Sequence, residues 1–215
     1  MLTVGVLTQM SQIDRRMAIR ETWFKVCKEN TDKVDCVFFT DGDEKSAIDE
    51  RDKFGDLVHM QTKGVINFSL FLLRMFKYFT LKYDFDFFLR VDDDYFVCMD
   101  RLLKELPHRP NTDLWWGWVH CYRNHQRVDE GFMILSSDII KEVLARENTT
   151  LLCHPFGDQA VAIWLNNRAK DTTYFMDNDR LMHSVSGKYE HIRNGLCNQF
   201  LGLHQAYPES MFFYW

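Results

Sequence analysis

The chain has 215 residues, of which 46% are hydrophobic and 27% charged, and its 31 acidic and 26 basic residues give a net charge of −5. This length and apolar content suffice for one domain with a sizeable core, and they exclude a disordered or collagen-like chain. A mildly acidic chain without a basic block is not typical of a nucleic-acid-binding protein, so no nucleic-acid partner is expected. An anionic substrate would need local cations or a metal ion to overcome the overall charge.

The six cysteines contain no CxxC pair, which excludes the usual zinc-ribbon and thioredoxin-like spacings. Their even number is compatible with disulfides in an oxidising compartment, and two N-x-S/T triplets, at Asn67 and Asn148, would accept glycans in a secretory lumen. The apolar stretch at the N-terminus is too short for a signal peptide or a membrane span. We therefore expect a chain that is soluble where it is made, or one whose membrane anchor has been removed.

The first half of the chain alternates between strand-like and helical patterns. Short β-branched or apolar runs, typical of strands, occupy 3–8, 36–40, 57–60 and 85–91, and helical spacings occupy 14–29, 44–53 and 68–82. The helix over 68–82 is apolar almost all round and should be largely buried. Four such alternations predict a parallel sheet with helices on its faces.

The second half is less regular. It predicts strands over 114–118 and 131–135, helices over 137–146 and 158–167, and a polar, loop-rich segment from 170 to about 198. We expect an α/β front half and an α+β back half that form one unit.

Three adjacent aspartates, Asp92, Asp93 and Asp94, follow directly after the fourth predicted strand. In extended geometry Asp92 and Asp94 point to the same side, and two like charges about 6 Å apart cost about 3 kcal/mol at an effective dielectric constant near 20. Ligands bind beyond the carboxyl ends of strands in open α/β sheets, and carboxylate oxygens suit Mn²⁺ or Mg²⁺ shared with substrate phosphates. The sequence therefore predicts a metal site here; the alternative is a solvated acidic turn with one aspartate capping the next helix.

Two arginines, Arg16 and Arg20, lie four residues apart on one helical face just after the first strand. A helix that begins at a strand's end is a natural anion site, and guanidinium groups match phosphate oxygens. We expect both to bind a phosphate-containing ligand; the alternative is a surface helix with its arginines in water.

The remaining candidates depend on weaker patterns. A carboxylate-bound metal would accept one imidazole, and His204, His154, His183 and His191 compete for that role. Asp158 opens a predicted helix, where it either caps the helix or takes a proton from a substrate hydroxyl. The tryptophans at 115, 116 and 118 either stack on a sugar ring or belong to the core, and alternation predicts that at least one is core.

Five segments stand in an order that resembles the β-1,3-glycosyltransferase family with a GT-A fold, glycosyltransferase family 31. They are RRMAIRETW (15–23), FFLRVDDDYF (87–96), GFMILSSD (131–138), GDQAVAIWL (157–165) and CNQFLGLH (197–204). The likeness extends from Thr3 to about Met211, and the WWGW segment and the C-terminal segment are closest to the galactosyltransferase branches. The resemblance implies an α/β fold with a mixed, mostly parallel central sheet flanked by helices. It also implies one catalytic domain over 1–215, with a nucleotide-binding half (1–100) and an acceptor-binding half (101–215).

The resemblance implies inverting, Mn²⁺-dependent transfer of a hexose from a UDP-sugar, most simply UDP-galactose, to a glycan or glycoprotein acceptor in a β-1,3 linkage. The metal ligands would be Asp92, Asp94 and His204, and Asp158 would be the general base. Donor-binding residues would be Asp92, Asp93, Arg16, Arg20 and Trp116. Relatives are anchored in the Golgi membrane and face the lumen, which implies the same location here.

The chain departs from the family at several positions. The E-D-V motif becomes Gly157-Asp158-Gln159, the lysine of the N-L-T-x-K stretch becomes Phe71, and the segment over 120–130 is shorter than usual. These departures keep two other hypotheses open: an N-acetylhexosaminyltransferase, and a UDP-sugar- or glycan-binding protein without activity. A metal-dependent phosphohydrolase that uses the same carboxylates ranks last.

Overall fold

The computed structural model describes residues 1–60, 67–122, 125–147, 151, 154–166, 168, 170–182 and 195–215. The strands are β1 (Leu2–Leu7), β2 (Val34–Thr40), β3 (Leu57–His59), β4 (Phe87–Asp92), β5 (Tyr95–Val97), β6 (Leu114–Tyr122), β7 (His125–Ser136), β8 (Thr173–Met176), β9 (Leu181–Met182) and β10 (Gly202–His204). The helices are α1 (Ile13–Glu21), α2 (Phe24–Glu29), α3 (Glu44–Phe54), α4 (Phe68–Lys82), α5 (Met99–Glu105), α6 (Ser137–Ala145), α7 (Gly157–Asn166), α8 (Leu196–Gln199) and α9 (Pro208–Tyr214), and a 3-10 turn, η1 (Leu106–His108), follows α5.

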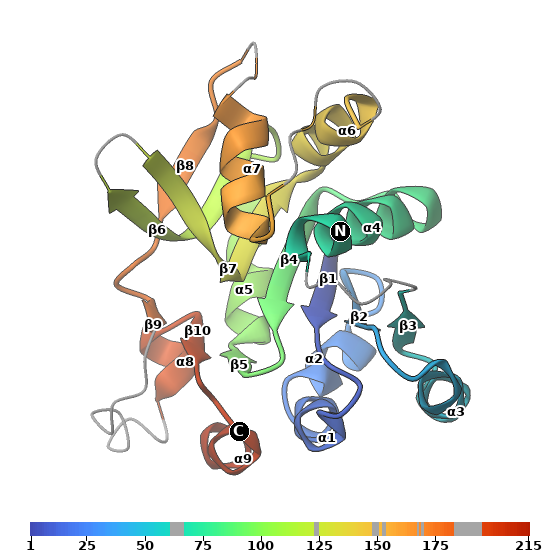
Figure 1. Ribbon diagram of the computed structural model, residues 1–215. Helices are drawn as coiled ribbons and strands as arrows, with labels where there is room; N and C mark the ends of the chain where they lie inside the picture. The colour runs from blue at the N-terminus through green and yellow to red at the C-terminus, as the bar shows by residue number, and fades with distance from the viewer. Residues whose placement is uncertain are drawn as a thin grey trace.

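The central sheet has seven strands in the order β3-β2-β1-β4-β7-β6-β8 (Figure 1). Its first four strands run parallel, as the alternation in the sequence predicted. The strand β7 then pairs antiparallel with β4 and with β6, so the sheet is mixed but mostly parallel. This architecture confirms the predicted α/β fold class.

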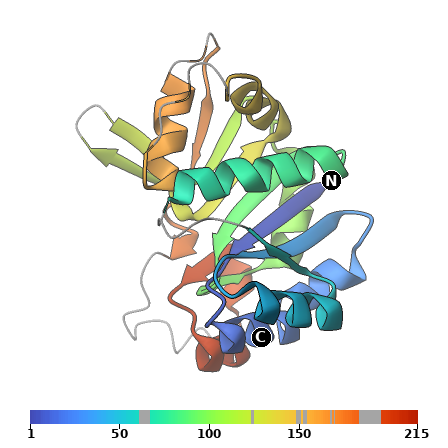
Figure 2. The same cartoon turned by 45° about the vertical axis from the view of Figure 1, so that its right-hand side comes forward.

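Helices cover both faces of this sheet and form two hydrophobic clusters (Figure 2). Alternate residues of one strand enter opposite clusters, for example Leu89 and Phe88 of β4. The helices α1, α2, α5 and α9 contribute to the first cluster, and α4, α6 and α7 to the second. The helix α4 begins and ends where predicted, and its inward-facing side chains are buried, including Phe76 and Phe79.

The predicted helix over 14–29 is divided into two. The Thr22 hydroxyl donates to the Ala18 carbonyl at 2.7 Å, and residues 22 and 23 form a turn between α1 and α2. A threonine bonded to its own backbone competes with helix continuation. The turn places Trp23 in the first cluster with no exposed surface, in edge contact with the ring of Phe24.

A small second sheet, β5-β10-β9, stands beside the first, and its strand β9 lies in the segment from 170 to about 198 that the sequence predicted to be loop-rich. The disulfide between Cys98 and Cys197 joins the start of α5 to α8, and a second disulfide joins Cys27 of α2 to Cys36 of β2. The triplet at Asn148, Cys153, His183 and His191 lie outside the described residues. Among the helices that the structure describes, none combines the length and apolarity needed to cross a membrane.

Candidate active site

The acidic cluster, which we define as Asp92, Asp94 and His204, lies beyond the carboxyl end of β4. The strand ends at Asp92, the chain turns through residues 93 and 94, and β5 begins at Tyr95. One potential ligand atom from each member of the cluster lies within 4.8 Å of the other two. Two carboxylate oxygens and an imidazole nitrogen therefore converge on one point, as a divalent ion requires.

The pairing of β10 with β5 brings His204 to the acidic turn. In that antiparallel pair His204 stands opposite Tyr95, and the two rings stack with centroids 5.5 Å apart. The Ala206 amide also donates to the Asp94 carbonyl at 2.8 Å, and His204 Nε2 lies 3.4 Å from Asp94 Oδ1. Of the competing histidines that the structure describes, His154 lies instead just before α7, where its Nδ1 accepts the Phe156 amide.

The two carboxylates of the acidic cluster have opposite electrostatic surroundings. Burial raises the pKa of Asp92, the neighbouring Asp94 adds to that rise, and Arg90 at 2.9 Å offsets it only in part. Burial also opposes ionisation of Asp94, but hydrogen bonding and charge from His204 outweigh it and lower the pKa of Asp94. Asp94 is thus stabilised as a carboxylate, whereas ionisation of the neighbouring Asp92 is unfavourable. A cation between the two would make that ionisation more favourable.

Asp93 lies in the turn between β4 and β5 and is almost fully buried. Its Oδ2 accepts from the Thr8 hydroxyl at 2.6 Å, and its Oδ1 pairs with Arg15 Nη1 at 2.7 Å. The residue therefore ties the turn after β4 to the loop after β1 and to α1. Its donor-binding role stays a prediction. Sequence reasoning missed Arg15, although that residue directly precedes Arg16 in the quoted motif.

The structure does not bring Arg16 and Arg20 to the acidic cluster. The Arg16 side chain has no exposed surface; it pairs with Glu50 of α3 and donates to carbonyls of the loop after β1. Arg20 pairs with Glu50 at 2.8 Å and with Asp56 at 2.6 Å. The expectation that both guanidinium groups face a ligand is corrected, because the exposed face of α1 carries Arg15 and the other two bind internal carboxylates.

Trp116 lies in the core and has no exposed surface. Its indole Nε1 donates to Asp177 at 2.9 Å, and its ring meets Phe175 edge-on. Trp115 is equally buried on the opposite face of the sheet, whereas Trp118 is only partly buried. The prediction that Trp116 contacts the donor is corrected, because both faces of β6 are covered by packed elements at this position.

Asp158 stands in the first turn of α7 with only 7% of its surface exposed. Arg127 of β7 donates to Asp158 Oδ2 at 2.5 Å, and the Gln159 amide donates to Oδ1 at 2.7 Å. Its carboxylate is thus held in a fixed orientation. Its role as general base stays a prediction.

A bulge in β7 supplies two further acids that sequence reasoning missed, Asp129 and Glu130. Gly117 of β6 is in register with Met133, but two residues further on Val119 is in register with Val128, five residues back along β7. The three extra residues of β7 have no register partner in β6, and such bulges are common beside active sites. Asp129 pairs with His120 at 2.9 Å, and Glu130 accepts the Gly157 amide at 2.8 Å.

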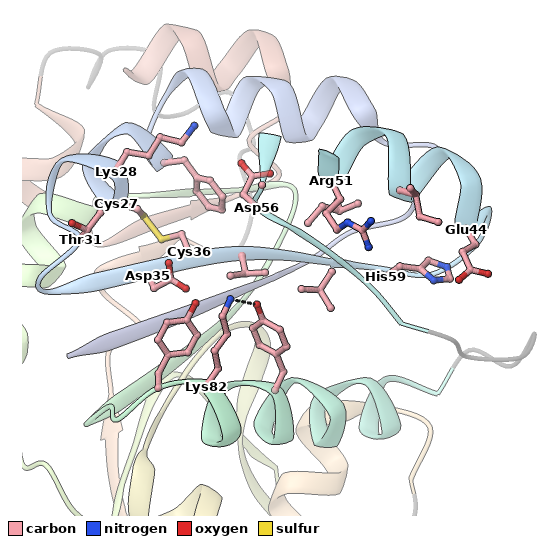
Figure 3. Close-up of a pocket in the computed structure, with 18 residues that line it drawn as sticks. Cys27, Lys28, Thr31, Asp35, Cys36, Glu44, Arg51, Asp56, His59 and Lys82 are labelled. Carbon is pink, nitrogen blue, oxygen red and sulfur yellow. Dashed lines mark hydrogen bonds between the residues drawn. A yellow bond between two sulfur atoms is a disulfide. The ribbon is translucent and has the colours of Figure 1, made fainter. Parts of the chain in front are cut away.

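A cavity of about 600 Å³ contains the acidic cluster. It is lined by the loop after β1 (7–12), Arg15, Asp41, Gly42, the start of α4 (67, 68 and 71), residues 92–94 and His204. A larger cavity of about 700 Å³ lies along the flank of β2 and β3, and Figure 3 shows Lys82, Asp35 and the Cys27–Cys36 disulfide around it. The two share no lining residue. We place the candidate site in the first cavity, because it lies at the carboxyl ends of β1, β2 and β4.

The model of the Galactosyltransferase family matches residues 14–133, more than half of the chain. The chain belongs to the galactosyltransferase family. That match begins in α1, includes Asp92 and Asp94, and ends within β7. It confirms the family that the motifs RRMAIRETW and VDDDYF predicted.

Two curated relatives carry names of β-1,3-transferases. The chain is 32% identical over 91 residues to the zebrafish (Danio rerio) UDP-GalNAc:beta-1,3-N-acetylgalactosaminyltransferase 2, which covers 41% of this chain and 18% of that protein. It is 25% identical over 241 aligned positions to mouse (Mus musculus) beta-1,3-galactosyltransferase 6, covering 98% of this chain and 71% of that protein. This galactosyltransferase-family chain therefore spans only part of each relative.

Two solved glycosyltransferases have the same fold. A glycosyltransferase involved in the glycosylation of the major capsid of PBCV-1 matches 94% of this chain and 91% of that chain, with a TM-score of 0.51 and 13% identity. The galactosyltransferase LgtC, in complex with donor and acceptor sugar analogs, matches 96% of this chain and 87% of its own, with a TM-score of 0.50 and 12% identity. At these identities the likeness shows the fold alone, and it confirms the GT-A-like fold.

Proposed function

We propose that the chain is an inverting, Mn²⁺-dependent hexosyltransferase that transfers galactose from UDP-galactose to a sugar hydroxyl in a β-1,3 linkage. The observation that carries the proposal is the acidic cluster, whose three ligand atoms lie within 4.8 Å of one another inside a cavity of about 600 Å³. The name of the mouse relative supports galactose and that of the zebrafish relative N-acetylgalactosamine, so an N-acetylhexosaminyltransferase is the alternative.

The donor set fits a divalent cation. Asp92, Asp94 and His204 offer two carboxylates and one imidazole, a combination that suits Mn²⁺ better than Ca²⁺, which favours oxygen ligands alone. These three residues would hold the ion. When bound, Mn²⁺ would supply a positive charge that stabilises a diphosphate leaving group.

The chain's own groups would position the donor and accept the proton. Arg15 and the loop after β1 line the cavity beside Asp93 and offer a cation and amides to the nucleotide. Asp158 would take the proton of the acceptor hydroxyl while the hydroxyl oxygen forms a bond to the anomeric carbon. The bond from that carbon to the diphosphate breaks, UDP leaves with the electron pair, and a single displacement inverts the anomer. Arg127 would keep the Asp158 carboxylate in place.

The proposed acceptor is a glycan or glycoprotein, and the proposed location is the Golgi lumen. Two disulfides support an oxidising compartment, because cytosolic chains seldom keep them. Any membrane attachment would come from an anchor outside the described helices.

The test is UDP release from UDP-galactose, UDP-GlcNAc, UDP-GalNAc and UDP-glucose, with and without Mn²⁺ and a panel of acceptor glycosides. We expect acceptor-dependent release that chelation abolishes, and losses of about 100-fold or more in Asp94→Asn and Asp158→Asn. Asp52→Asn, at an exposed position on α3, is the matched control and should keep full activity. Release that is unchanged in both site variants would refute the proposal. UDP binding without turnover would indicate a silent binder, and formation of sugar-1-phosphate would indicate a phosphohydrolase.

A further inference from the structure

Glu130 lies next to the proposed base but has no role in the reaction outlined above. Its Oε2 accepts the backbone amide of Gly157 at 2.8 Å, and Asp158 is the following residue. Burial raises the pKa of Glu130, and the nearby charges of Asp158 and Asp92 raise it further. Two carboxylates from different elements, the β7 bulge and α7, are therefore held side by side.

The space that Glu130 occupies is available because residue 157 is glycine. A Cβ atom at position 157 would come within 2.6 Å of Glu130 Oε2, closer than real contacts allow. The carboxylate of Glu130 thus fills the volume in which a side chain at 157 would begin. Position 157, where the E-D-V motif has glutamate, is glycine in this chain, and the Glu130 carboxylate from β7 occupies the space beside it.

Each of the two carboxylates has an arginine partner and remaining capacity to accept hydrogen bonds. Arg127 lies 2.5 Å from Asp158 Oδ2, and Arg90 lies 3.9 Å from Glu130 Oε2. Among the residues that the structure describes, no hydrogen-bond donor contacts Glu130 Oε1, although 20% of that side chain is exposed. A carboxylate oxygen accepts up to two hydrogen bonds, so Oε1 has capacity for a hydroxyl from outside the chain.

We infer that Glu130 and Asp158 together bind two adjacent hydroxyls of the acceptor sugar. This inference rests on the proposed function: Asp158 receives the proton of the attacking hydroxyl, and Glu130 accepts a hydrogen bond from the hydroxyl on the neighbouring ring carbon. One hydroxyl carries one proton, so two adjacent carboxylates are best satisfied by two hydroxyls. Glu130 thereby selects acceptors with a vicinal diol and sets which of its hydroxyls attacks.

The test compares acceptors that differ by one hydroxyl. The probes are methyl β-glycosides of galactose, xylose and N-acetylglucosamine, and for whichever serves as acceptor, its derivatives lacking one hydroxyl beside the attacking one. We expect the wild-type chain to use one deoxy acceptor at least about 10-fold less well by kcat/KM, since a hydrogen bond to a charged group is lost. In Glu130→Ala that discrimination should fall below about threefold, while the KM for the donor stays unchanged.

Two further variants separate this role from a structural one. Glu105→Ala removes a carboxylate of similar exposure that pairs with Arg109 and Arg180 rather than with the start of α7, and it should keep the discrimination. If Glu130→Ala does not fold, Glu130→Gln keeps the shape and should weaken the discrimination. The double variant Glu130→Gly with Gly157→Glu places a carboxylate in the same space from α7, and restored discrimination would support the assignment.

The outcomes distinguish the inference from the proposed function. Acceptor-dependent UDP release with full discrimination in a folded Glu130 variant would overturn the inference and leave the transferase proposal intact. A wild-type chain that releases no UDP with any acceptor would overturn both.

Discussion

Arg15 and Arg16 are adjacent in α1, but their guanidinium groups lie in different surroundings. Arg15 is one-quarter exposed and pairs with Asp93 at the candidate cavity, whereas Arg16 is fully buried against Glu50. One residue is a rotation of about 100° around a helix, which moves a side chain from the cavity to the interior. A buried charge that loses its partner costs about 3–5 kcal/mol, and an exposed one costs little.

Substitutions of Arg15 and of Arg16 should therefore affect different properties, ligand binding for Arg15 and stability for Arg16. Arg15→Met should weaken binding of UDP with Mn²⁺ by about 10-fold, the loss of one charge-assisted contact, with a change in unfolding free energy below about 1 kcal/mol. Arg16→Met should lower the free energy of unfolding by about 2–4 kcal/mol, because Glu50 keeps only Arg20 as a buried partner and two loop carbonyls lose their Arg16 donor. Calorimetric UDP titration and urea denaturation of both variants make the comparison. Weakened binding without loss of stability in Arg16→Met would show that Arg16 contacts the donor after all.

Trp116 provides a second test at this scale. Trp116→Phe removes the indole donor from Asp177 but keeps most of the buried ring. We expect the unfolding free energy to fall by about 1–3 kcal/mol and the KM for the UDP-sugar to stay within twofold. Thermal denaturation and initial-rate kinetics measure the two quantities. A KM for the UDP-sugar that rises 10-fold at unchanged stability would show that Trp116 does contact the donor.

The two aspartates of the acidic cluster could be predicted from local sequence, whereas the choice of His204 and the surroundings of Asp158 could not. Asp92 and Asp94 follow an apolar run in one local segment, so the sequence sufficed to place both carboxylates just after a strand, where the chain turns at residues 93 and 94. Glu130 and Arg127 reach Asp158 only through the register of β7 and its bulge, which depend on pairing with β6 and β4. A bulge changes which residues share a face, and no local pattern in 125–136 marks it.

At the scale of elements, the long apolar helix α4 was predictable, and the short strands after residue 170 were not. The helix α4 matches its predicted range, because its apolar side chains fix both type and length. The strands β8, β9 and β10 have four, two and three residues, and they exist only through pairing with β6 and β5. Strand propensity depends on such partners, which explains why β8 and β9 were not predicted in the loop-rich segment from 170 to about 198.

The small sheet depends on a disulfide that closes a long loop. Cys98 and Cys197 are 99 residues apart, and the Cys98 amide donates to the Leu201 carbonyl at 2.9 Å, one residue before β10. The Cys98–Cys197 disulfide therefore helps to hold β10, the strand that places His204 next to Asp94. The Cys27–Cys36 disulfide closes only nine residues, away from the cluster.

The two disulfides should therefore differ in effect. Replacing Cys98 and Cys197 by serine should lower the unfolding free energy by up to about 5 kcal/mol and also weaken Mn²⁺ binding, since β10 is released. Replacing Cys27 and Cys36 should cost about 2–3 kcal/mol and leave Mn²⁺ affinity unchanged. Urea denaturation and Mn²⁺ titration by calorimetry test both. Equal Mn²⁺ affinity in the two folded double variants would contradict a role of the first disulfide in positioning His204.

At the scale of the whole molecule, carboxylates divide into two groups with opposite pKa shifts. Burial alone would raise the pKa of Glu50 and of Glu105, but hydrogen bonds from arginines outweigh it and lower both. In Asp92 and Glu130, burial prevails and raises the pKa. Glu50 and Glu105 lie in structural ion pairs, whereas Asp92 and Glu130 lie at or beside the candidate site, where ionisation of these two opposes folding although His204 lowers the pKa of the neighbouring Asp94.

This division predicts how stability depends on pH. A carboxylate whose pKa is lowered by folding stabilises the native state above its unfolded pKa, about 4.3 for glutamate, and loses that contribution as the pH falls through the folded value. The unfolding free energy of the wild-type chain should therefore fall below about pH 4.5. Glu50→Gln should be less stable than wild type at pH 7, since Arg16 and Arg20 lose a charged partner, and the difference should shrink as the pH falls below the unfolded pKa of glutamate. Urea denaturation of both chains at several pH values measures this difference in unfolding free energy. A difference that stays constant from pH 7 to 3.5 would mean that the Glu50 ion pairs contribute no charge-dependent stability.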